Sequence, residues 1–134
     1  MTPRLSKSRI QSGRQCHKRL WLELHQPHVS RWTASAQARL DEGTLFGNLA
    51  RDLLGGGALI AADHLHVDEA IAETAALLAL PTHQVPMLFE PAFSHEGVRV
   101  RVDAFQRHGD RDALIEVKST TSVKQEHLWD CAIQ

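Results

Sequence analysis

Three charged residues in the second half of the chain have the types and spacing of a metal site. Asp103 ends a run in which valines alternate with charged residues, so the valines face a core and Asp103 faces the opposite side of a strand. Glu116 and Lys118 share a face of the next strand, about 7 Å apart by the rise per residue. Because a short turn joins the two strands, Asp103 is expected to approach Glu116 across the sheet.

Two converging carboxylates repel each other unless a cation lies between them. Mg²⁺ or Mn²⁺ suits such an oxygen-rich site, polarises a phosphoryl oxygen and lowers the pKa of a bound water. Lys118 would orient that water or offset negative charge in the transition state. The spacing therefore favours phosphodiester hydrolysis, although a solvated face of an antiparallel sheet is an alternative explanation of the same pattern.

The elements that must position these residues follow from apolar periodicity and turn signals. Residues 85–93, 98–105 and 113–118 are β-branched or aromatic runs, separated by turn-forming segments at 95–97 and 108–110. They predict a three-stranded antiparallel meander. Helices are predicted over 5–10, 18–24, 34–54, 67–80 and 124–134. The first of these helices is expected to have a serine cap, at Ser6 or Ser8.

The helix predicted over 34–54 carries Phe46, Leu49 and Leu53 at intervals of three and four. This spacing predicts one buried stripe. The glycines at 55–57 are expected to end the helix, because glycine supplies the positive φ of a carboxyl-terminal cap.

Length and composition bound the class of protein. With 134 residues and 43% hydrophobic content, the chain suits one compact domain. It has no apolar run long enough to cross a bilayer and no signal-peptide pattern at its start, so we expect a soluble, cytoplasmic protein with no membrane partner. Its two cysteines are far apart in sequence and predict buried or free thiols.

Charge is distributed unevenly, although the net charge is only −1. Residues 1–31 contain seven basic residues and one acidic residue, so the rest of the chain is net acidic. A basic amino-terminal segment predicts contacts with nucleic-acid phosphates, with a solvated helical surface as the alternative. The residues expected to make these contacts are Lys7, Arg9, Arg14, Lys18 and Arg19.

Five segments resemble, in order, the amino-terminal nuclease-like region of bacterial DUF2779 proteins: LSKS at 5–8, CHKRLWL at 16–22, EGTLFGNLAR at 42–51, LFE at 88–90 and IEVKSTT at 115–121. That family is similar to the Cas4- and RecB-like branch of the PD-(D/E)XK nuclease superfamily. The resemblance extends from about Leu5 to Gln134.

The resemblance implies an α/β fold with a restriction-endonuclease-like core, in which helices flank a central mixed sheet that contains the antiparallel meander. It implies a single domain over 1–134, with a basic helical segment at 1–33 and the catalytic core at 34–134. Relatives continue beyond the helix that contains Gln134. We therefore expect a core that is truncated at its carboxyl end and weakly active by itself.

Carried over by residue, the resemblance makes Asp103 and Glu116 metal ligands and Lys118 the catalytic lysine. Val117 would lend a backbone carbonyl to the metal. Gln134 would support the active site from the following helix. These roles predict a catalytic set of four residues, two of which bind the metal together with Val117.

Three further positions are less specific. Glu90 is expected to support the site from the preceding strand, or else to be an ordinary acid at a strand edge. Gly47 stands where relatives often place a metal-binding histidine. Cys16 resembles the first cysteine of relatives with an iron–sulfur cluster, but two cysteines are too few for its four ligands, so we expect no cluster in this chain and a packed thiol.

The sequence therefore predicts a metal-dependent nuclease domain that hydrolyses phosphodiester bonds, with the preference for DNA implied by the resemblance alone. A non-catalytic nucleic-acid-binding remnant or accessory module with the same fold is the first alternative. A structural interaction domain, in which the three charged residues are merely solvated, is the second.

Overall fold

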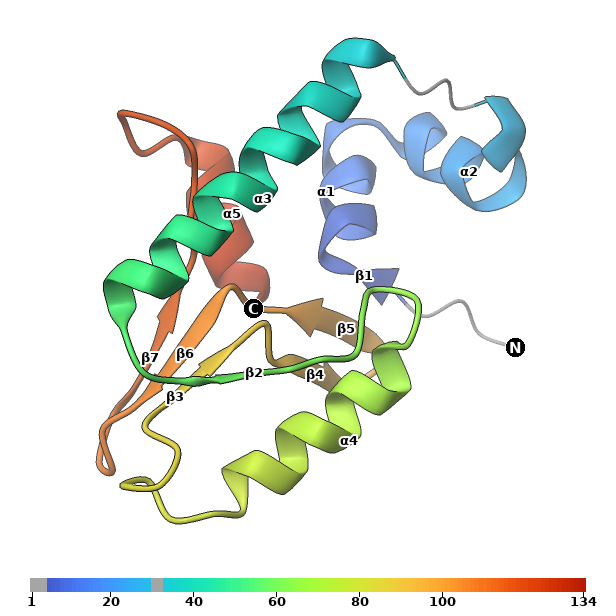
Figure 1. Ribbon diagram of the computed structural model, residues 1–134. Coiled ribbons are helices and arrows are strands. Elements are labelled where there is room, and N and C mark those ends of the chain that lie inside the picture. The colour runs from blue at the N-terminus through green and yellow to red at the C-terminus, as the bar shows by residue number, and fades with distance from the viewer. Residues whose placement is uncertain (1–4, 30–32) are drawn as a thin grey trace.

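The computed structural model describes residues 5–29 and 33–134 and shows an α/β protein (Figure 1). Arg4 and Arg31 of the basic segment lie outside the described residues. None of the helices in the described ranges is long and apolar enough to cross a membrane. In chain order the elements are β1 (Leu5–Ser6), α1 (Lys7–Gln15), α2 (His17–His25), the 3-10 helix η1 (Pro27–Val29), α3 (Ala34–Leu54), β2 (Ala58–Leu59), α4 (Val67–Leu78), β3 (Met87–Phe89), β4 (Ala92–His95), β5 (Val98–Arg101), β6 (Ala104–Arg107), β7 (Asp112–Ile115) and α5 (Gln125–Ile133).

The strands form two mixed sheets with the orders β1-β5-β4 and β2-β3-β6-β7. The pairs β4-β5, β3-β6 and β6-β7 are antiparallel, which confirms the predicted meander. Both predicted turns contain residues with positive φ, at Glu96 and Gly97 in the first and Gly109 in the second. The short strands β1 and β2, which pair in parallel at the sheet edges, escaped prediction because two residues carry no periodicity.

The two sheets are joined where the predicted strands bend. Between β3 and β4, Glu90 has a φ of 57°, a conformation that is unusual for a residue with a side chain. Pairing continues past the bend, because Glu90 N donates to Asp103 O at 3.1 Å and Val102 N donates to Pro91 O at 3.0 Å. The run predicted as one strand over 98–105 is therefore two strands, and Asp103 lies at the break. Irregularities of this kind are frequent beside active sites.

The main core lies between α4 and the sheets. Ala70 and Thr74 of α4 are buried, and Ala70 packs with Leu88 and Ala92. The Thr74 hydroxyl donates to Ala70 O at 2.7 Å and accepts from Ala92 N at 3.0 Å, so α4 is fixed to β4 by a satisfied polar contact as well as by packing. This confirms the amphipathic helix predicted there.

Helix α3 has the predicted bounds, with Thr33 as its cap and Gly55 at a φ of 69° after its end. The predicted buried stripe is wrong. No residue of α3 is buried, and Phe46, Leu49 and Leu53 are 40%, 47% and 85% exposed. Helical periodicity identifies an apolar face, whereas burial needs an element to cover that face, and none of the described elements does so.

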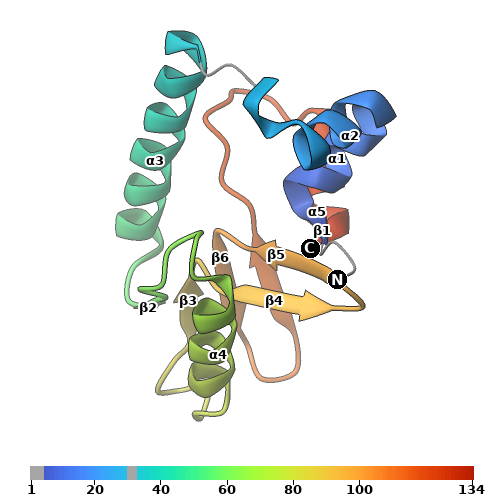
Figure 2. The same cartoon turned by 90° about the vertical axis from the view of Figure 1, so that its right-hand side faces the viewer.

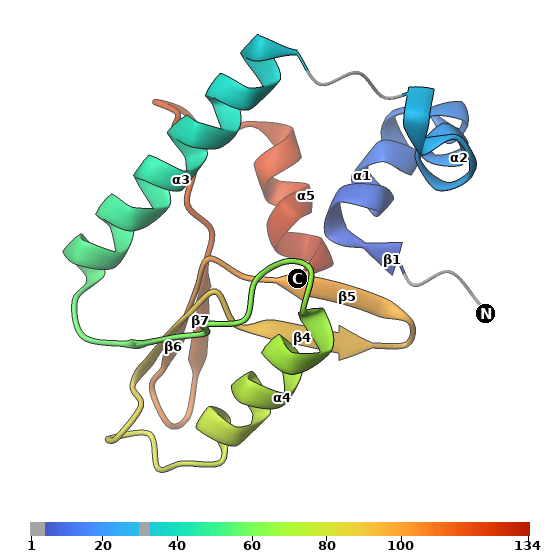
Figure 3. The ribbon, with the colours of Figure 1, turned by 45° about the vertical axis from the view of Figure 1, so that its right-hand side comes forward.

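Helices α1 and α5 lie side by side, and α4 lies on the far side of the strands from them (Figures 2 and 3). The predicted serine cap of α1 is Ser6, whose hydroxyl accepts from Arg9 N at 3.3 Å. The Arg14 guanidinium lies 3.4 Å from the centroid of the Trp129 ring, a cation–π contact that links α1 to α5. This pairing of helices brings side chains from both ends of the chain to the segment after β7 that carries Glu116.

Candidate active site

The predicted acids meet at the break between the sheets. Asp103 lies between β5 and β6, whereas Glu116, Val117 and Lys118 directly follow β7. Val117 N donates to Asp103 Oδ2 at 2.6 Å, so the two segments are in contact at the site. The carbonyl role expected for Val117 stays a prediction, while its amide has a role that was not foreseen.

The Glu116 side chain is only 4% exposed. Its Oε1 accepts from Lys118 Nζ at 2.7 Å and from Lys7 Nζ at 2.9 Å, and its Oε2 accepts from Gln134 Nε2 at 2.8 Å. Burial alone would raise the pKa of Glu116, but the hydrogen bonds from Lys118, Lys7 and Gln134 outweigh it and lower the pKa. Glu116 is therefore held as a carboxylate.

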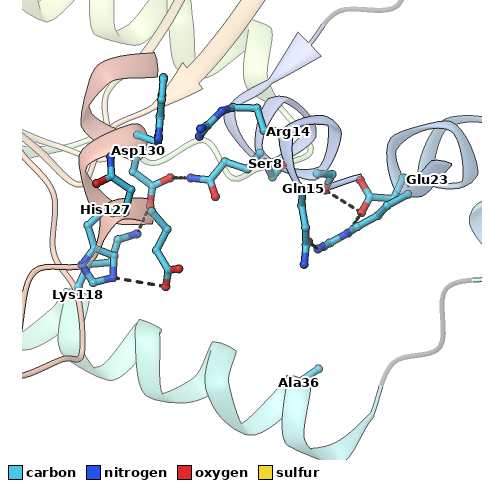
Figure 4. Close-up of a pocket in the computed structure, with 14 residues that line it drawn as sticks. Ser8, Arg14, Gln15, Glu23, Ala36, Lys118, His127 and Asp130 are labelled. Carbon is cyan, nitrogen blue, oxygen red and sulfur yellow. Dashed lines mark hydrogen bonds and ion pairs between the residues drawn. The ribbon is translucent and has the colours of Figure 1, made fainter. Parts of the chain in front are cut away.

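Lys118 bridges two acids, because its Nζ also lies 2.7 Å from Asp130 Oδ2 on α5. Burial favours the neutral amine, yet the contacts with Asp130 and Glu116 prevail and raise the pKa of Lys118. Gln11 of α1 donates a second hydrogen bond to Asp130. Figure 4 shows the Lys118 and Asp130 side chains pointing toward each other. Lys118 is thus a fixed positive charge and not a proton acceptor.

Asp103 has the opposite electrostatic environment. Burial raises its pKa, the hydrogen bond from Val117 N opposes that shift, and the charge of Glu116 adds to it, with a raised pKa as the result. No basic side chain in the described part of the chain forms an ion pair with Asp103. A neutralising cation would relieve this unfavourable charge.

Glu90 lies beside Asp103 at the bend, as predicted for a supporting residue. Its carboxylate is 3.2 Å from Arg101 Nε and 3.7 Å from Arg51 Nη1. Burial still raises the pKa of Glu90, and the charge of Asp103 adds to the shift. A small cavity of about 10 Å³ is lined by Glu90, Asp103 and Gly47 of α3, so Gly47 borders the same cavity as Asp103.

The Gln134 side-chain amide lies beside Glu116, because its Nε2 donates to Glu116 Oε2 at 2.8 Å and to the Arg101 carbonyl oxygen at 3.3 Å. Its Oε1 is buried and has no hydrogen-bond partner among the described residues. An unsatisfied buried acceptor next to a carboxylate is a position where a water or a cation is expected.

The predicted phosphate-binding residues lie in different surroundings. Arg14 and Arg19 line a cavity of about 1090 Å³ between α1, α5 and α3, which Lys118 also lines (Figure 4). Lys18 lines a separate hollow with Arg19, and Arg9 lines another with Lys7. Only part of the basic segment therefore borders the cavity next to Lys118.

A divalent metal fits these donors in part. In residues 5–29 and 33–134 no three His, Cys, Asp or Glu side chains form a group that could hold a metal. Mg²⁺ needs fewer protein ligands, because it is usually bound by one or two carboxylates with waters and substrate phosphates. Asp103, Glu116 and the unsatisfied Gln134 Oε1 match that requirement. However, two ammonium groups already contact Glu116 Oε1, so a cation that binds at this oxygen must displace one of them.

Asp130 was not predicted as a functional residue. Asp130 is buried and holds Lys118, and it precedes Gln134 by one helical turn. The shared helix face of these two residues was the available signal. Both cysteines are free thiols, as predicted, but the packed thiol expected at Cys16 is wrong, because Cys16 and Cys131 are both exposed. Cys131 lies on α5, whereas Cys16 lies between α1 and α2.

Comparison with known proteins gives no relative on which to base a function. No family model matches the chain, and neither the curated proteins nor the solved structures contain a significant match.

Proposed function

We propose that this chain is a metal-dependent nuclease domain that hydrolyses phosphodiester bonds of DNA, on a restriction-endonuclease-like core similar to the PD-(D/E)XK superfamily. One observation carries the proposal. Asp103 and Glu116 converge at a bend in the sheet, and the Lys118 ammonium is fixed 2.7 Å from Glu116. Two carboxylates and one lysine in such an arrangement suit cleavage of a phosphodiester.

In this proposal Asp103 and Glu116 hold Mg²⁺ or Mn²⁺. When bound, the cation would polarise a phosphoryl oxygen and lower the pKa of a water. Lys118 stays protonated because Asp130 and Glu116 raise its pKa, so it stabilises negative charge on the reacting phosphate and takes no proton. Gln134 keeps Glu116 oriented through its hydrogen bond to Oε2.

The DNA strand would enter through the cavity between α1 and α5. Arg14 and Arg19 line it, and Lys118 lines the same cavity from the catalytic side. Arginines on this path would contact phosphates and position the strand without reading its sequence. Arg19 is paired with Glu23 at 2.8 Å, so Arg14 is the stronger candidate for a phosphate contact.

The test is cleavage of end-labelled DNA with Mg²⁺ or Mn²⁺ and with a chelator. Wild-type protein should cut only with the metal, and Lys118→Met should lose most of the activity while it stays folded. Lys124→Met is the matched control, because Lys124 is exposed and does not line the cavity that Lys118 lines. DNA binding without cleavage would favour the non-catalytic accessory module. Neither binding nor cleavage would favour a structural domain.

A further inference from the structure

Lys7 is the first residue of α1, and its side chain contacts Glu116, which is 109 positions away in the chain. Its backbone is fixed by the parallel pairing of β1 with β5, where Leu5 N donates to Gly97 O at 3.0 Å. Its side chain is 22% exposed, and its ammonium lies 2.9 Å from Glu116 Oε1. Lys7 is therefore placed on a buried acid and not on an open surface.

The two lysines at Glu116 are not equivalent. Lys118 has two acidic partners, Glu116 and Asp130, so it keeps a counter-ion if either contact is lost. For Lys7 the contact is with Glu116 Oε1, the same oxygen that Lys118 uses. The Lys7 ammonium is therefore displaced from Glu116 more easily than the Lys118 ammonium.

The net charge of the site also indicates Lys7 as the group that a cation would displace. Three acids, Asp103, Glu116 and Asp130, lie next to the two lysines, and the neighbouring Glu90 already has its own partners in Arg51 and Arg101. A divalent cation added to all five groups leaves an excess positive charge, whereas the acids and Lys118 alone would be neutralised by it. Since like charges disfavour each other at short range, Lys7 opposes the cation.

We infer that Lys7 is a positioning residue that holds Glu116 when no metal is bound and competes with the divalent cation for Glu116 Oε1. This inference rests on the proposed metal site. It gives Lys7 a role different from the phosphate contact expected from the sequence. Removal of its charge should loosen the metal-free protein and tighten metal binding, two effects of opposite sign that a purely structural contact would not produce.

The experiment is a calorimetric titration of the whole chain with Mn²⁺, with no DNA present. Wild type is compared with Lys7→Met and with Lys7→Gln, which keeps a hydrogen-bond donor without the charge. One neighbouring unit charge changes the proton affinity of a carboxylate by about tenfold or more, so a Kd for Mn²⁺ lower by about tenfold is expected in both variants. Lys7→Arg should stay close to wild type.

Lys18→Met is the matched control, because Lys18 belongs to the same basic segment but is exposed and lines a different hollow. It should leave the Kd unchanged. Thermal melts supply the second readout: without metal, Lys7→Met should melt several degrees below wild type, and Mn²⁺ should raise its Tm more than that of wild type.

An unchanged or higher Kd in Lys7→Gln would overturn the inference and leave the proposed nuclease site intact. Weaker DNA binding with unchanged Mn²⁺ affinity would return Lys7 to the role of a phosphate contact. If wild type and every variant fail to bind millimolar Mn²⁺, the metal site itself is wrong, and the competition falls with it.

Discussion

The two ends of the candidate site differ in how they are held. At the Glu116 end, side chains from α1, α5 and the end of β7 supply three donors to one carboxylate. At the Asp103 end, the carboxylate accepts from the Val117 amide, and the neighbouring helix α3 contributes Gly47 to the lining and buries none of its own residues. The result is a lowered pKa for Glu116 and a raised pKa for Asp103.

This difference shows that two acids with matching roles in a sequence motif need not be equivalent in the fold. Glu116 is stabilised as an anion by the protein alone. For Asp103, burial and the charge of Glu116 outweigh the Val117 hydrogen bond and the charges of Lys7 and Lys118, so a cation would stabilise its carboxylate. Unfavourable charge of this kind is frequent at functional sites.

The largest expected effect is on catalysis. Glu116→Gln and Asp103→Asn should each reduce metal-dependent cleavage by at least about a hundredfold, because each removes a ligand charge at the reacting centre. Cleavage is measured under single-turnover conditions, with circular dichroism as the check on folding. Loss in one variant but not in the other would mean that the acids do not share one metal.

The same two substitutions should affect stability in opposite directions. Without metal, Glu116→Gln should lower the free energy of unfolding by about 1–3 kcal/mol, because it leaves the Lys7 ammonium without its charged partner. Asp103→Asn should raise stability, because the amide has no charge to desolvate. Urea unfolding of the two variants beside wild type measures both changes, and destabilisation of equal size would abolish the distinction between the two ends.

The stability differences should also depend on pH. Because the folded pKa of Glu116 is lowered, its contribution is present above the ordinary pKa of 4.5 and is lost as the pH falls through the folded value. Because the folded pKa of Asp103 is raised above the ordinary 3.8, its burial lowers the free energy of unfolding as the pH rises from 3.8 through the folded pKa. Both variants should therefore converge on wild type in acid. Differences that stay constant from pH 7 to about 3 would show that neither acid titrates as described.

The smallest effect is expected from α3. Leu53 is 85% exposed, so Leu53→Ser should change the free energy of unfolding by less than about 0.5 kcal/mol. Leu88→Ala is the contrasting variant, since Leu88 is fully buried in the α4 core and its truncation should cost about 2–5 kcal/mol. A large effect of Leu53→Ser would show that α3 is covered in solution.

Much of the fold was predictable from periodicity. The bounds of α3, the meander, and the glycine that ends α3 all followed from apolar spacing and turn chemistry. The break at Asp103 was not, because it lies opposite the positive φ of Glu90 between β3 and β4, and no local pattern encodes that pairing. The burial of α3 was predicted wrongly, since periodicity alone does not supply a partner.

The same limit applies to the site. Spacing placed Glu116 beside Lys118 and predicted the approach of Asp103, and the resemblance brought Gln134 to the same place. Lys7 is 109 positions from Glu116 in the chain, so its contact depends on the packing of α1 against β5. Nothing in the local sequence distinguishes Lys7 from the other basic residues of its segment, so this contact could not be predicted.

The most direct test is a Mn²⁺ titration of wild type beside the double variant Asp103→Ala, Glu116→Ala. If the two carboxylates share a divalent cation, wild type should bind one Mn²⁺ per chain, and the double variant should bind at least about a hundredfold more weakly, because two ligand charges are lost. Equal binding by the two proteins, with both folded, would contradict a metal site at this bend of the sheet.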